Sequence, residues 1–457
     1  MKILENKFLR INIVELKKNE YEFGRFVMAL KNLEESDDWP RIAGIHGNTF
    51  KPNDPGVLCP TNLDVVEKLA ETGEPFYCKH SVVSFIAWHT PYIYQFELLL
   101  NKYNNCEDKS YIALPYLDLT IQTDNFDFLN EPEIDILFNN EYIRISNPLA
   151  GATYYVNGIK TDTTRNGFLN AKTKEEVLTI NTVKKQLSKV LNEPTYEDFS
   201  SNRVSIEKTG EQIKNTPLEV PHNTVHNVIG GEGGNMTDVS ISAFDPLFWF
   251  HHCNMDRYFY NWMYYNTCHF ANPLEVHQIE PETLELSQAP FFPEINHEPI
   301  DIKYGWLNDT FEFQKLSNIL DLANYPYTYN KIKKQFTDEK HINLELVDIP
   351  IPMESCNIHL YLIPKNQSAN YNKEDCLAGI THWFGINRHR KHCTRCMVGR
   401  TNLQIDITDY ISKCNISNKN IGDYNIHIEA KGLLNKNMIY SMDEIIRDGY
   451  YVINNLL

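Results

Sequence analysis

The sequence predicts a mainly helical N-terminal domain followed by a smaller, β-rich C-terminal domain. Three observations predict this order: stretches with apolar residues at helical spacing in the first part, a charged and poorly periodic stretch after residue 330, and period-two alternation beyond it. A length of 457 residues also suits two or three domains rather than one core. We therefore expect one domain over 1–330, a linker over 331–345 and a second domain over 346–457.

Two helix starts in the first domain show the same signal. Thr90-Pro91 and Asp245-Pro246 each place an N-cap residue before a proline, which suits the first helical position. Apolar residues then repeat on one helix face: Ile93, Phe96, Leu99 and Leu100 after the first start, and Leu247, Phe248, Met255, Phe259 and Trp262 after the second. Residues 101–215 are rich in Asn, Asp and Thr, and they predict irregular loops with few elements.

Three short segments of the second domain predict β-strands. Residues 358–362, 403–407 and 424–428 alternate apolar and polar side chains or are β-branched, with turn residues between them. This pattern predicts a β-rich domain.

Composition and charge exclude several classes of protein. The 43 basic and 60 acidic residues give a net charge of −17, which argues against a nucleic-acid partner. No run of about 18 apolar residues is present, so no membrane-spanning segment is expected. The first residues lack the apolar core of a secretory signal, so we expect a cytoplasmic protein whose ten cysteines are mostly reduced.

Histidines supply the strongest indication of a metal site. His222 and His226 are four residues apart, which on a helix places both imidazoles on one face and suits two ligands of one ion. His80 and His89 would be out of phase on one helix, so we expect His80 in a loop and His89 at the start of the following helix. An all-imidazole site suits copper, zinc, iron or nickel, and the spacing does not choose among them.

Two longer segments resemble the copper-binding segments of the tyrosinase and molluscan haemocyanin family. The first segment comprises His46-Gly47, Cys78-Lys79-His80, Phe85-Ile86-Ala87-Trp88-His89, Tyr92 and Phe96-Glu97. The second comprises Pro221-His222-Asn223-Thr224-Val225-His226, Gly230-Gly231 and the run from Asp245 to Arg257, which contains Phe248, His251, His252 and Asp256. The second match is the more specific, and the resemblance is strong over about residues 8–330.

The resemblance implies two copper ions inside a four-helix bundle, with O2 as co-substrate. By the family pattern, His46, His80 and His89 bind one copper, and His222, His226 and His252 bind the other. His251 and Asp256 would then lie behind the ligands, and Cys78 would form a thioether cross-link with His80.

The family also implies a reaction. Its enzymes hydroxylate monophenols and oxidise o-diphenols to o-quinones, so we expect a small phenolic substrate such as tyrosine or a catechol. Asn223, with Glu219 or else Glu211, would hold the water that deprotonates the phenol, and Phe248 would stack on the substrate ring. A haemocyanin-like O2 carrier and a catechol oxidase limited to diphenols are the alternatives. Thr90 departs from the pattern, which usually has Arg after the third ligand.

The second domain is similar to the β-sandwich shielding domain of latent fungal tyrosinases. Phe384, or else Trp383, would cover the coppers. Cys393 and Cys396 would assist copper loading, with a copper chaperone as a possible partner, although a disulfide or idle thiols would explain the pair as well. The family further implies that Arg10 packs against Tyr327 and closes the catalytic domain. The oligomeric state stays open.

Overall fold

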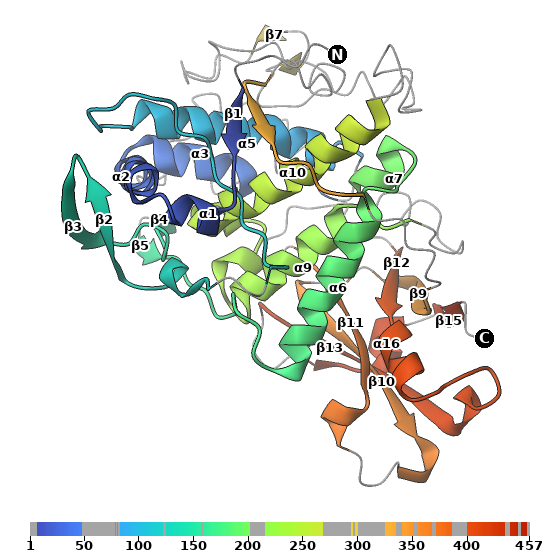
Figure 1. Ribbon diagram of the computed structural model, residues 1–457. Coiled ribbons are helices and arrows are strands. Elements are labelled where there is room, and N and C mark those ends of the chain that lie inside the picture. Colours follow the sequence, from blue (N-terminus) through green and yellow to red (C-terminus); the bar gives the residue numbers. More distant parts are fainter. Residues whose placement is uncertain are drawn as a thin grey trace.

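The computed structural model shows a helical N-terminal part and a strand-rich C-terminal part, as the sequence predicts (Figure 1). It describes residues 7–47, 78, 80, 83–121, 125–156, 159–201, 215–267, 294–295, 298–299, 325–334, 341–350, 352, 354–367, 372–385, 400–434, 439–446 and 449–454. None of the helices in these ranges is long and apolar enough to cross a membrane.

Long helices build the N-terminal part, and α10 packs against both α5 and α9. The described helices are α1 (Ile13–Lys17), α2 (Glu20–Glu34), α3 (Asp38–Gly47), α5 (Phe85–Lys102), α6 (Lys174–Val190), α7 (Tyr196–Ser200), α9 (Glu219–Gly230) and α10 (Pro246–Thr267). Aromatic side chains fill the space between them, and the rings of Phe96 in α5 and Trp249 in α10 stack with centroids 4.0 Å apart. This packing holds α5 and α10 side by side.

The starts of α5 and α10 differ in how well the sequence predicts them. Helix α10 begins at Pro246 as predicted, and the Asp245 carboxylate accepts a hydrogen bond from Leu247 N at 2.8 Å. The prediction for α5 is wrong, because that helix begins at Phe85 and contains Pro91 in its interior. Pro91 cannot donate a helical hydrogen bond, but Phe85 and its neighbours are fully buried, and this apolar burial offsets the loss.

The prediction that residues 101–215 have few elements is also wrong. This stretch contains the hairpins β2 (Glu133–Phe138) with β3 (Glu141–Ser146) and β4 (Thr153–Val156) with β5 (Ile159–Asp162), besides helices α6 and α7. Asn139 and Asn140 both have positive φ, as a tight two-residue hairpin turn requires. A capping box of Thr173 and Glu176 starts α6, and this sequence signal would have located the helix.

The two ends of the N-terminal part are joined by a short parallel ladder. Strand β1 (Phe8–Arg10) pairs with β8 (Tyr327–Tyr329), two segments far apart in sequence (Figure 1). The fully buried Arg10 guanidinium lies 3.4 Å from the Tyr327 ring centroid, the contact that the family resemblance implies. It also forms ion pairs with Glu97 at 2.7 Å and Asp256 at 3.0 Å.

Two antiparallel sheets form the C-terminal part and share one hydrophobic core. Their strands are β9 (Asn343–Pro350), β10 (Cys356–Pro364), β11 (Leu377–Trp383), β12 (Arg400–Asp406), β13 (Tyr424–Gly432), β14 (Ile439–Tyr440) and β15 (Tyr450–Asn454), in the orders β11-β10-β13-β14 and β12-β9-β15. The short helices α16 (Thr408–Lys413) and α17 (Met442–Ile446) flank them, and β6 (Glu294–Ile295) pairs with β7 (Glu298–Pro299) elsewhere in the chain. The predicted strands lie in β10, β12 and β13, except that Ile407 follows the end of β12, and β9 begins within the range predicted as a linker.

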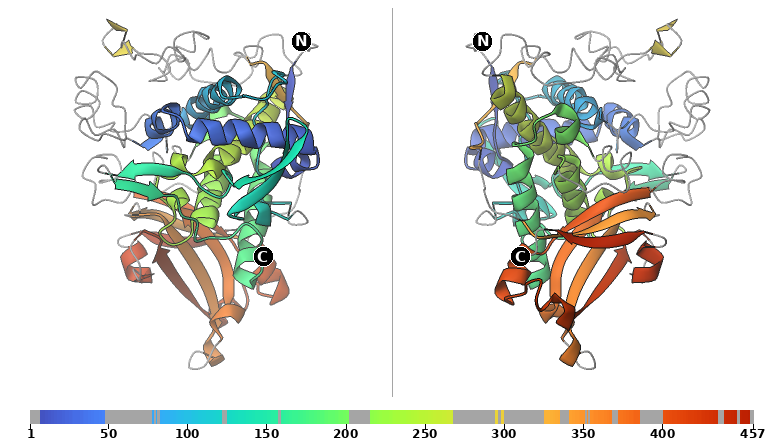
Figure 2. Two further views of the ribbon diagram at one scale, coloured as in Figure 1. Left: turned by 90° about the vertical axis from the view of Figure 1, so that its left-hand side faces the viewer. Right: turned by 90° about the vertical axis from the view of Figure 1, so that its right-hand side faces the viewer.

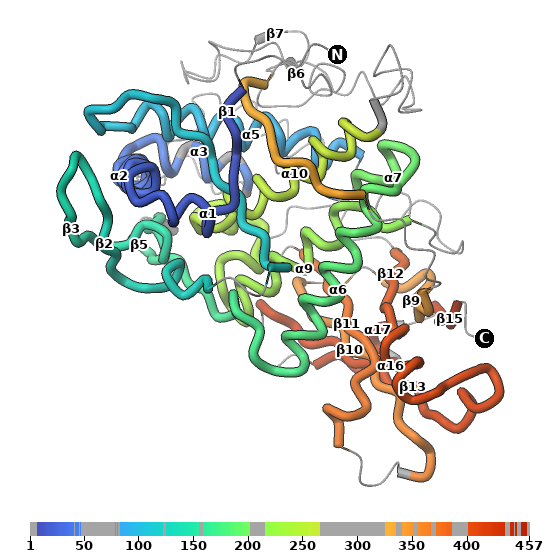
Figure 3. Tube along the Cα trace, viewed as in Figure 1, coloured from blue at the N-terminus to red at the C-terminus, as the bar shows by residue number. Residues whose placement is uncertain are grey.

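The strand-rich part packs beneath the helices, against α6 and α9, in every view (Figures 2 and 3). Asn227 of α9 donates to Trp383 O at 3.0 Å, and Ser355 Oγ donates to Thr237 O at 2.6 Å. Glu175 of α6 contacts His359 Nε2 of β10 at 2.8 Å. Polar contacts therefore fix the strand-rich part against the helices, close to the segment that contains His222 and His226.

Candidate metal centre

Seven histidine side chains form one cluster, called here the histidine cluster: His46, His80, His89, His222, His226, His251 and His252. They come from α3, α5, α9, α10 and the segment before α5. Six of them are fully buried, and His80 is partly buried. Six of the seven are the predicted copper ligands, so the fold brings together histidines that are far apart in sequence.

The ring centroid of His46 lies 5.6 Å from that of His80 and 5.6 Å from that of His89, and the centroids of His80 and His89 are 5.4 Å apart. Nδ1 of His46 donates to Val239 O at 3.0 Å, and Nδ1 of His89 donates to Phe85 O at 2.7 Å. Because a carbonyl oxygen only accepts, the ring proton of each is on Nδ1 and Nε2 keeps its lone pair. Within the described residues neither Nε2 has a hydrogen-bond partner, which is the arrangement of a metal-ligating imidazole.

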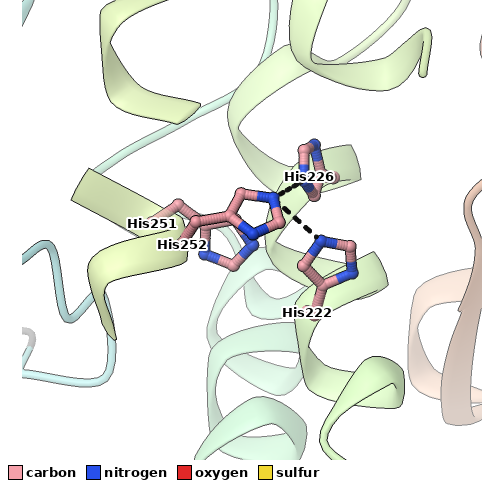
Figure 4. Close-up of side chains that lie close together, drawn as sticks. All are labelled: His222, His226, His251 and His252. Atoms are coloured by element: carbon pink, nitrogen blue, oxygen red, sulfur yellow. Dashed lines mark hydrogen bonds between the residues drawn. The ribbon is translucent and has the colours of Figure 1, made fainter. Parts of the chain in front are cut away.

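His222, His226 and His252 form the second group (Figure 4). His222 and His226 lie one turn apart on α9, which confirms that their spacing is helical. Nδ1 of His226 donates to Met236 O at 2.8 Å, and the Nε2 atoms of His222 and His226 lie 3.2 and 3.3 Å from Nε2 of His252. A proton on Nε2 of His252 can form a hydrogen bond with only one of those two nitrogens. A cation between the rings could bind all three Nε2 atoms. The donor set therefore fits a metal ion.

Burial keeps these imidazoles neutral. Removal from water lowers the pKa of His80 and of His251 to about 3. It also lowers the pKa of His46, His89 and His222 well below the ordinary value, and repulsion from neighbouring imidazoles adds to the shift. Neutral imidazole is the form that binds a metal, so the histidine cluster is in its ligand-competent state near pH 7.

His251 lies nearer to the other imidazoles than the sequence suggests. Its ring stacks on His222 with centroids 5.1 Å apart and lies 4.9 Å from His226. Neither of its ring nitrogens bonds to a side chain in the described part of the chain. His222, His226, His251 and His252 have ligand atoms within 4.8 Å of one another and could hold one ion, and so could His46, His89 and His252. The geometry thus adds a fourth imidazole to the second group.

Cys78 and Thr90 are the neighbours of the ligands that the sequence singled out. Cys78 Sγ lies 3.6 Å from Nδ1 of His80, and His46, Cys78 and His80 form a third group that could hold a metal. Thr90, which replaces the usual Arg, donates from Oγ1 to Asp256 at 2.8 Å. Asp256 also forms an ion pair with Arg10 of strand β1, so this buried carboxylate has a cationic partner.

Two phenylalanine rings border the histidine cluster from different parts of the chain. The ring centroid of Phe248 in α10 lies 4.7 Å from that of His46 and 4.2 Å from that of His252. Phe384, which follows strand β11, stacks on His226 with centroids 4.2 Å apart and an angle of 21°. Its ring also lies 5.9 Å from His222 and 5.7 Å from His80. Phe384 therefore covers imidazoles of both groups.

Glu219 and Asn223 lie four residues apart on α9, so they share a helix face, and both are buried. The Oδ1 atom of Asn223 accepts a hydrogen bond from Nδ1 of His222 at 2.9 Å. Asn223 thus orients a predicted ligand directly. The other predicted site residues, Glu211, Cys393 and Cys396, lie outside the described residues.

Comparisons with known proteins agree with this geometry. The family described as "Common central domain of tyrosinase" matches residues 36–265, about half of the chain. The tyrosinase of Podospora anserina is 27% identical over 314 residues, which are 58% of this chain and 53% of that protein. The chain thus spans about half the length of this relative.

Two solved structures show the same fold. The deoxygenated hemocyanin of Rapana thomasiana superposes with a TM-score of 0.67 at 18% identity, covering 98% of this chain and 99% of the other. Recombinant mushroom tyrosinase superposes with a TM-score of 0.65 at 17% identity, covering 97% and 98%. Together with the family match and the buried histidine cluster, these similarities show that the chain belongs to the tyrosinase family of type-3 copper proteins.

Proposed function

We propose that this protein oxidises phenols with O2 at a pair of copper ions and that its strand-rich part keeps the site closed. The observation that carries the proposal is the buried histidine cluster with Phe384 stacked on His226. We assign His46, His80 and His89 to one copper and His222, His226 and His252 to the other. Helices α3, α5, α9 and α10 would form the four-helix bundle of the family, and the two sheets its β-sandwich. The bound copper pair would supply the redox chemistry that activates O2.

The protein residues would position the phenol and move its proton. Phe248 packs edge-on to His46 and would stack on the substrate ring. Glu219 and Asn223 would hold the water that takes the phenolic proton, because they lie on one face of α9 next to His222. The hydrogen bond from His222 to Asn223 keeps Nε2 of this imidazole directed toward the metal.

Two cysteine features complete the proposal. Cys78 is in contact with His80, and we propose that they form the thioether bond of the family, which would fix this loop histidine. Cys393 and Cys396 would receive copper, with a copper chaperone as the donor.

The test of this function uses Phe384→Gly. If Phe384 occupies the place of the phenol, removing its ring raises the fraction of molecules that can bind substrate. We expect the copper-loaded variant to oxidise tyrosine and catechol about tenfold faster or more than the unchanged chain. Tyr450→Gly is the control, because this ring is in the same part of the chain and is 48% exposed. Steady-state absorbance of the quinone measures both variants.

The haemocyanin-like alternative rests on the superposition with the Rapana thomasiana structure. It predicts reversible O2 binding and negligible oxidation of either phenol even by Phe384→Gly. That result with a copper-replete protein would reject the proposed enzyme. A catechol oxidase limited to diphenols would turn over catechol and leave tyrosine unchanged.

Asn223→Gly tests the proton-transfer role. We expect the ratio of tyrosine to catechol oxidation to fall about tenfold, because the monophenol is the weaker acid and depends more on the held water to remove its proton. Asn223→Asp is the matched control, since a carboxylate oxygen can still accept the hydrogen bond from His222 Nδ1 and hold the water. Copper analysis of each variant separates this role from loss of the ligand. An unchanged ratio in a copper-replete Asn223→Gly protein would remove Asn223 from the mechanism.

A further inference from the structure

A cavity lies between the helical and strand-rich parts, and none of its lining residues belongs to the histidine cluster. Its volume is about 50 Å³, and it is bordered by helix α6, the segment before α9 and strands β9, β11 and β12. Since a water molecule needs at least about 10–15 Å³ of such space, the cavity has room for about four water-sized groups. This is the size of a small polar ligand.

One wall of this cavity holds a lysine that forms no ion pair within the described residues, although the carboxylates of Asp406 and Glu193 act on it from a greater distance. Lys189 and Lys185 both line it from α6. Lys185 forms an ion pair with Asp409 at 2.6 Å, whereas Lys189 forms none with any described residue. Partial burial lowers the pKa of Lys189, which means that the surroundings disfavour its charge. An anion in the cavity would offset that penalty.

Strand β11 contributes to the lining a histidine with a ring nitrogen that receives no hydrogen bond from the described residues. His382 of β11 is only 6% exposed, and its Nδ1 lies 2.8 Å from Oδ1 of Asn357. That oxygen also accepts from Nδ2 of Asn227 at 3.4 Å, so the ring proton of His382 is on Nδ1. Nε2 of His382 therefore carries a lone pair, and no described residue donates to it. A buried acceptor of this kind favours a ligand with a hydrogen to donate.

The remaining polar groups of the walls agree with such a ligand. Oε1 of Gln186 is a second buried acceptor with no donor among the described residues. The carboxylate of Asp406 also lines the cavity, but it already binds Nδ1 of His341 at 3.1 Å and the backbone N of Thr408 at 2.9 Å. Hydrogen bonds from other groups of the protein thus already stabilise the negative charge of Asp406. The walls therefore combine a lysine that forms no ion pair within the described residues with two acceptors that have no donor there.

We propose that this cavity binds an oxyanion that carries a hydrogen, namely hydrogen phosphate or the phosphoryl group of a small phosphomonoester. An anionic oxygen would pair with Lys189, and the P–OH group would donate to Nε2 of His382. The two residues belong to α6 and β11, so the ligand binds only while the helical and strand-rich parts are together, and it stabilises that state. An effect on latency rests on the proposed function, whereas the binding itself does not.

Isothermal titration calorimetry of the full chain at pH 7 and constant ionic strength tests the proposal. Inorganic phosphate is expected to bind at least about tenfold more tightly than sulfate, which has no hydrogen to donate to His382. Lys189→Gln is expected to weaken phosphate binding about tenfold or more. Lys184→Gln, an exposed position on the same helix outside the cavity, is the control and is expected to bind as the unchanged chain does.

His382→Phe is expected to abolish the preference for phosphate over sulfate. Should this variant fail to fold, the phosphate-to-sulfate ratio of the unchanged chain still decides the question. Equal affinities for the two anions, or an equal loss of binding in Lys184→Gln and Lys189→Gln, would overturn the proposal. A parallel titration with glycerol 3-phosphate distinguishes free phosphate from a phosphomonoester as the ligand. If glycerol 3-phosphate binds more tightly than phosphate, the site is assigned to a phosphomonoester. Neither titration depends on oxidase activity, so failure of the proposed function leaves this test intact.

Discussion

His226→Ala is expected to lose one copper ion per chain and to lower phenol oxidation at least about a hundredfold. Replacing groups that merely orient metal ligands costs about 10–100-fold, and removal of a ligand costs more. His226 Nε2 lies 3.3 Å from Nε2 of His252, and its ring is held by the bond from Nδ1 to Met236 O. Alanine removes both the donor atom and this anchor.

Copper content per chain and steady-state oxidation of catechol, both in the Phe384→Gly background, measure the effect. His427→Ala is the matched control, because His427 lies in the strand-rich part with a side chain that is 43% exposed. The control is expected to keep its copper and its rate. A His226→Ala protein with an unchanged copper content would contradict the assignment of this ligand.

Arg10→Met is expected to destabilise the protein by roughly 3–5 kcal/mol, the range for breaking a buried ion pair by removing one partner. The guanidinium is fully buried and pairs with Glu97 and Asp256. Methionine keeps much of the apolar volume but leaves both carboxylates buried without their cation. Burial already raises the pKa of the Asp256 carboxyl, and Arg10 opposes that shift, so its loss leaves this group still harder to ionise.

The midpoint of denaturant unfolding, followed by tryptophan fluorescence, measures the loss. Arg144→Met is the control, since Arg144 pairs with Glu133 at 2.9 Å while its side chain is 64% exposed. Exposed pairs of this kind contribute about 0–1 kcal/mol. Equal midpoints for the two variants would show that the ion pairs of Arg10 do not hold the two ends of the N-terminal part together.

Local sequence signals predicted the helices and strands whose formation depends mainly on residues close together in the sequence. The interval between His222 and His226, the Asp245-Pro246 start of α10 and the alternation in β10 all depend on short-range periodicity. The start of α5 was missed because burial of Phe85 outweighs the penalty of an internal proline, and burial is a tertiary effect. Helix α6 was missed although its capping box is visible in the sequence.

The candidate metal centre shows the same contrast between local sequence signals and effects of tertiary packing. Spacing indicated two imidazoles of one site, and the family resemblance supplied the others. Neither indicated that the ring of His251 would stack on His222 without a side-chain hydrogen bond of its own, because this depends on how α10 lies against α9. The cavity lined by Lys189 and His382 could not be predicted from the sequence either, because its walls belong to segments that meet only in the folded chain.

The pairing of β1 with β8 has a consequence for synthesis of the chain. Arg10 and Tyr329 are 319 residues apart, and at roughly 5–20 residues per second the ribosome needs on the order of 20–60 s to pass from one to the other. All seven histidines of the cluster have been made before Tyr329 emerges. During this interval β1 lacks its ladder partner β8 and Arg10 lacks its tyrosine contacts, so β1 must stay accessible in the nascent chain until β8 is translated.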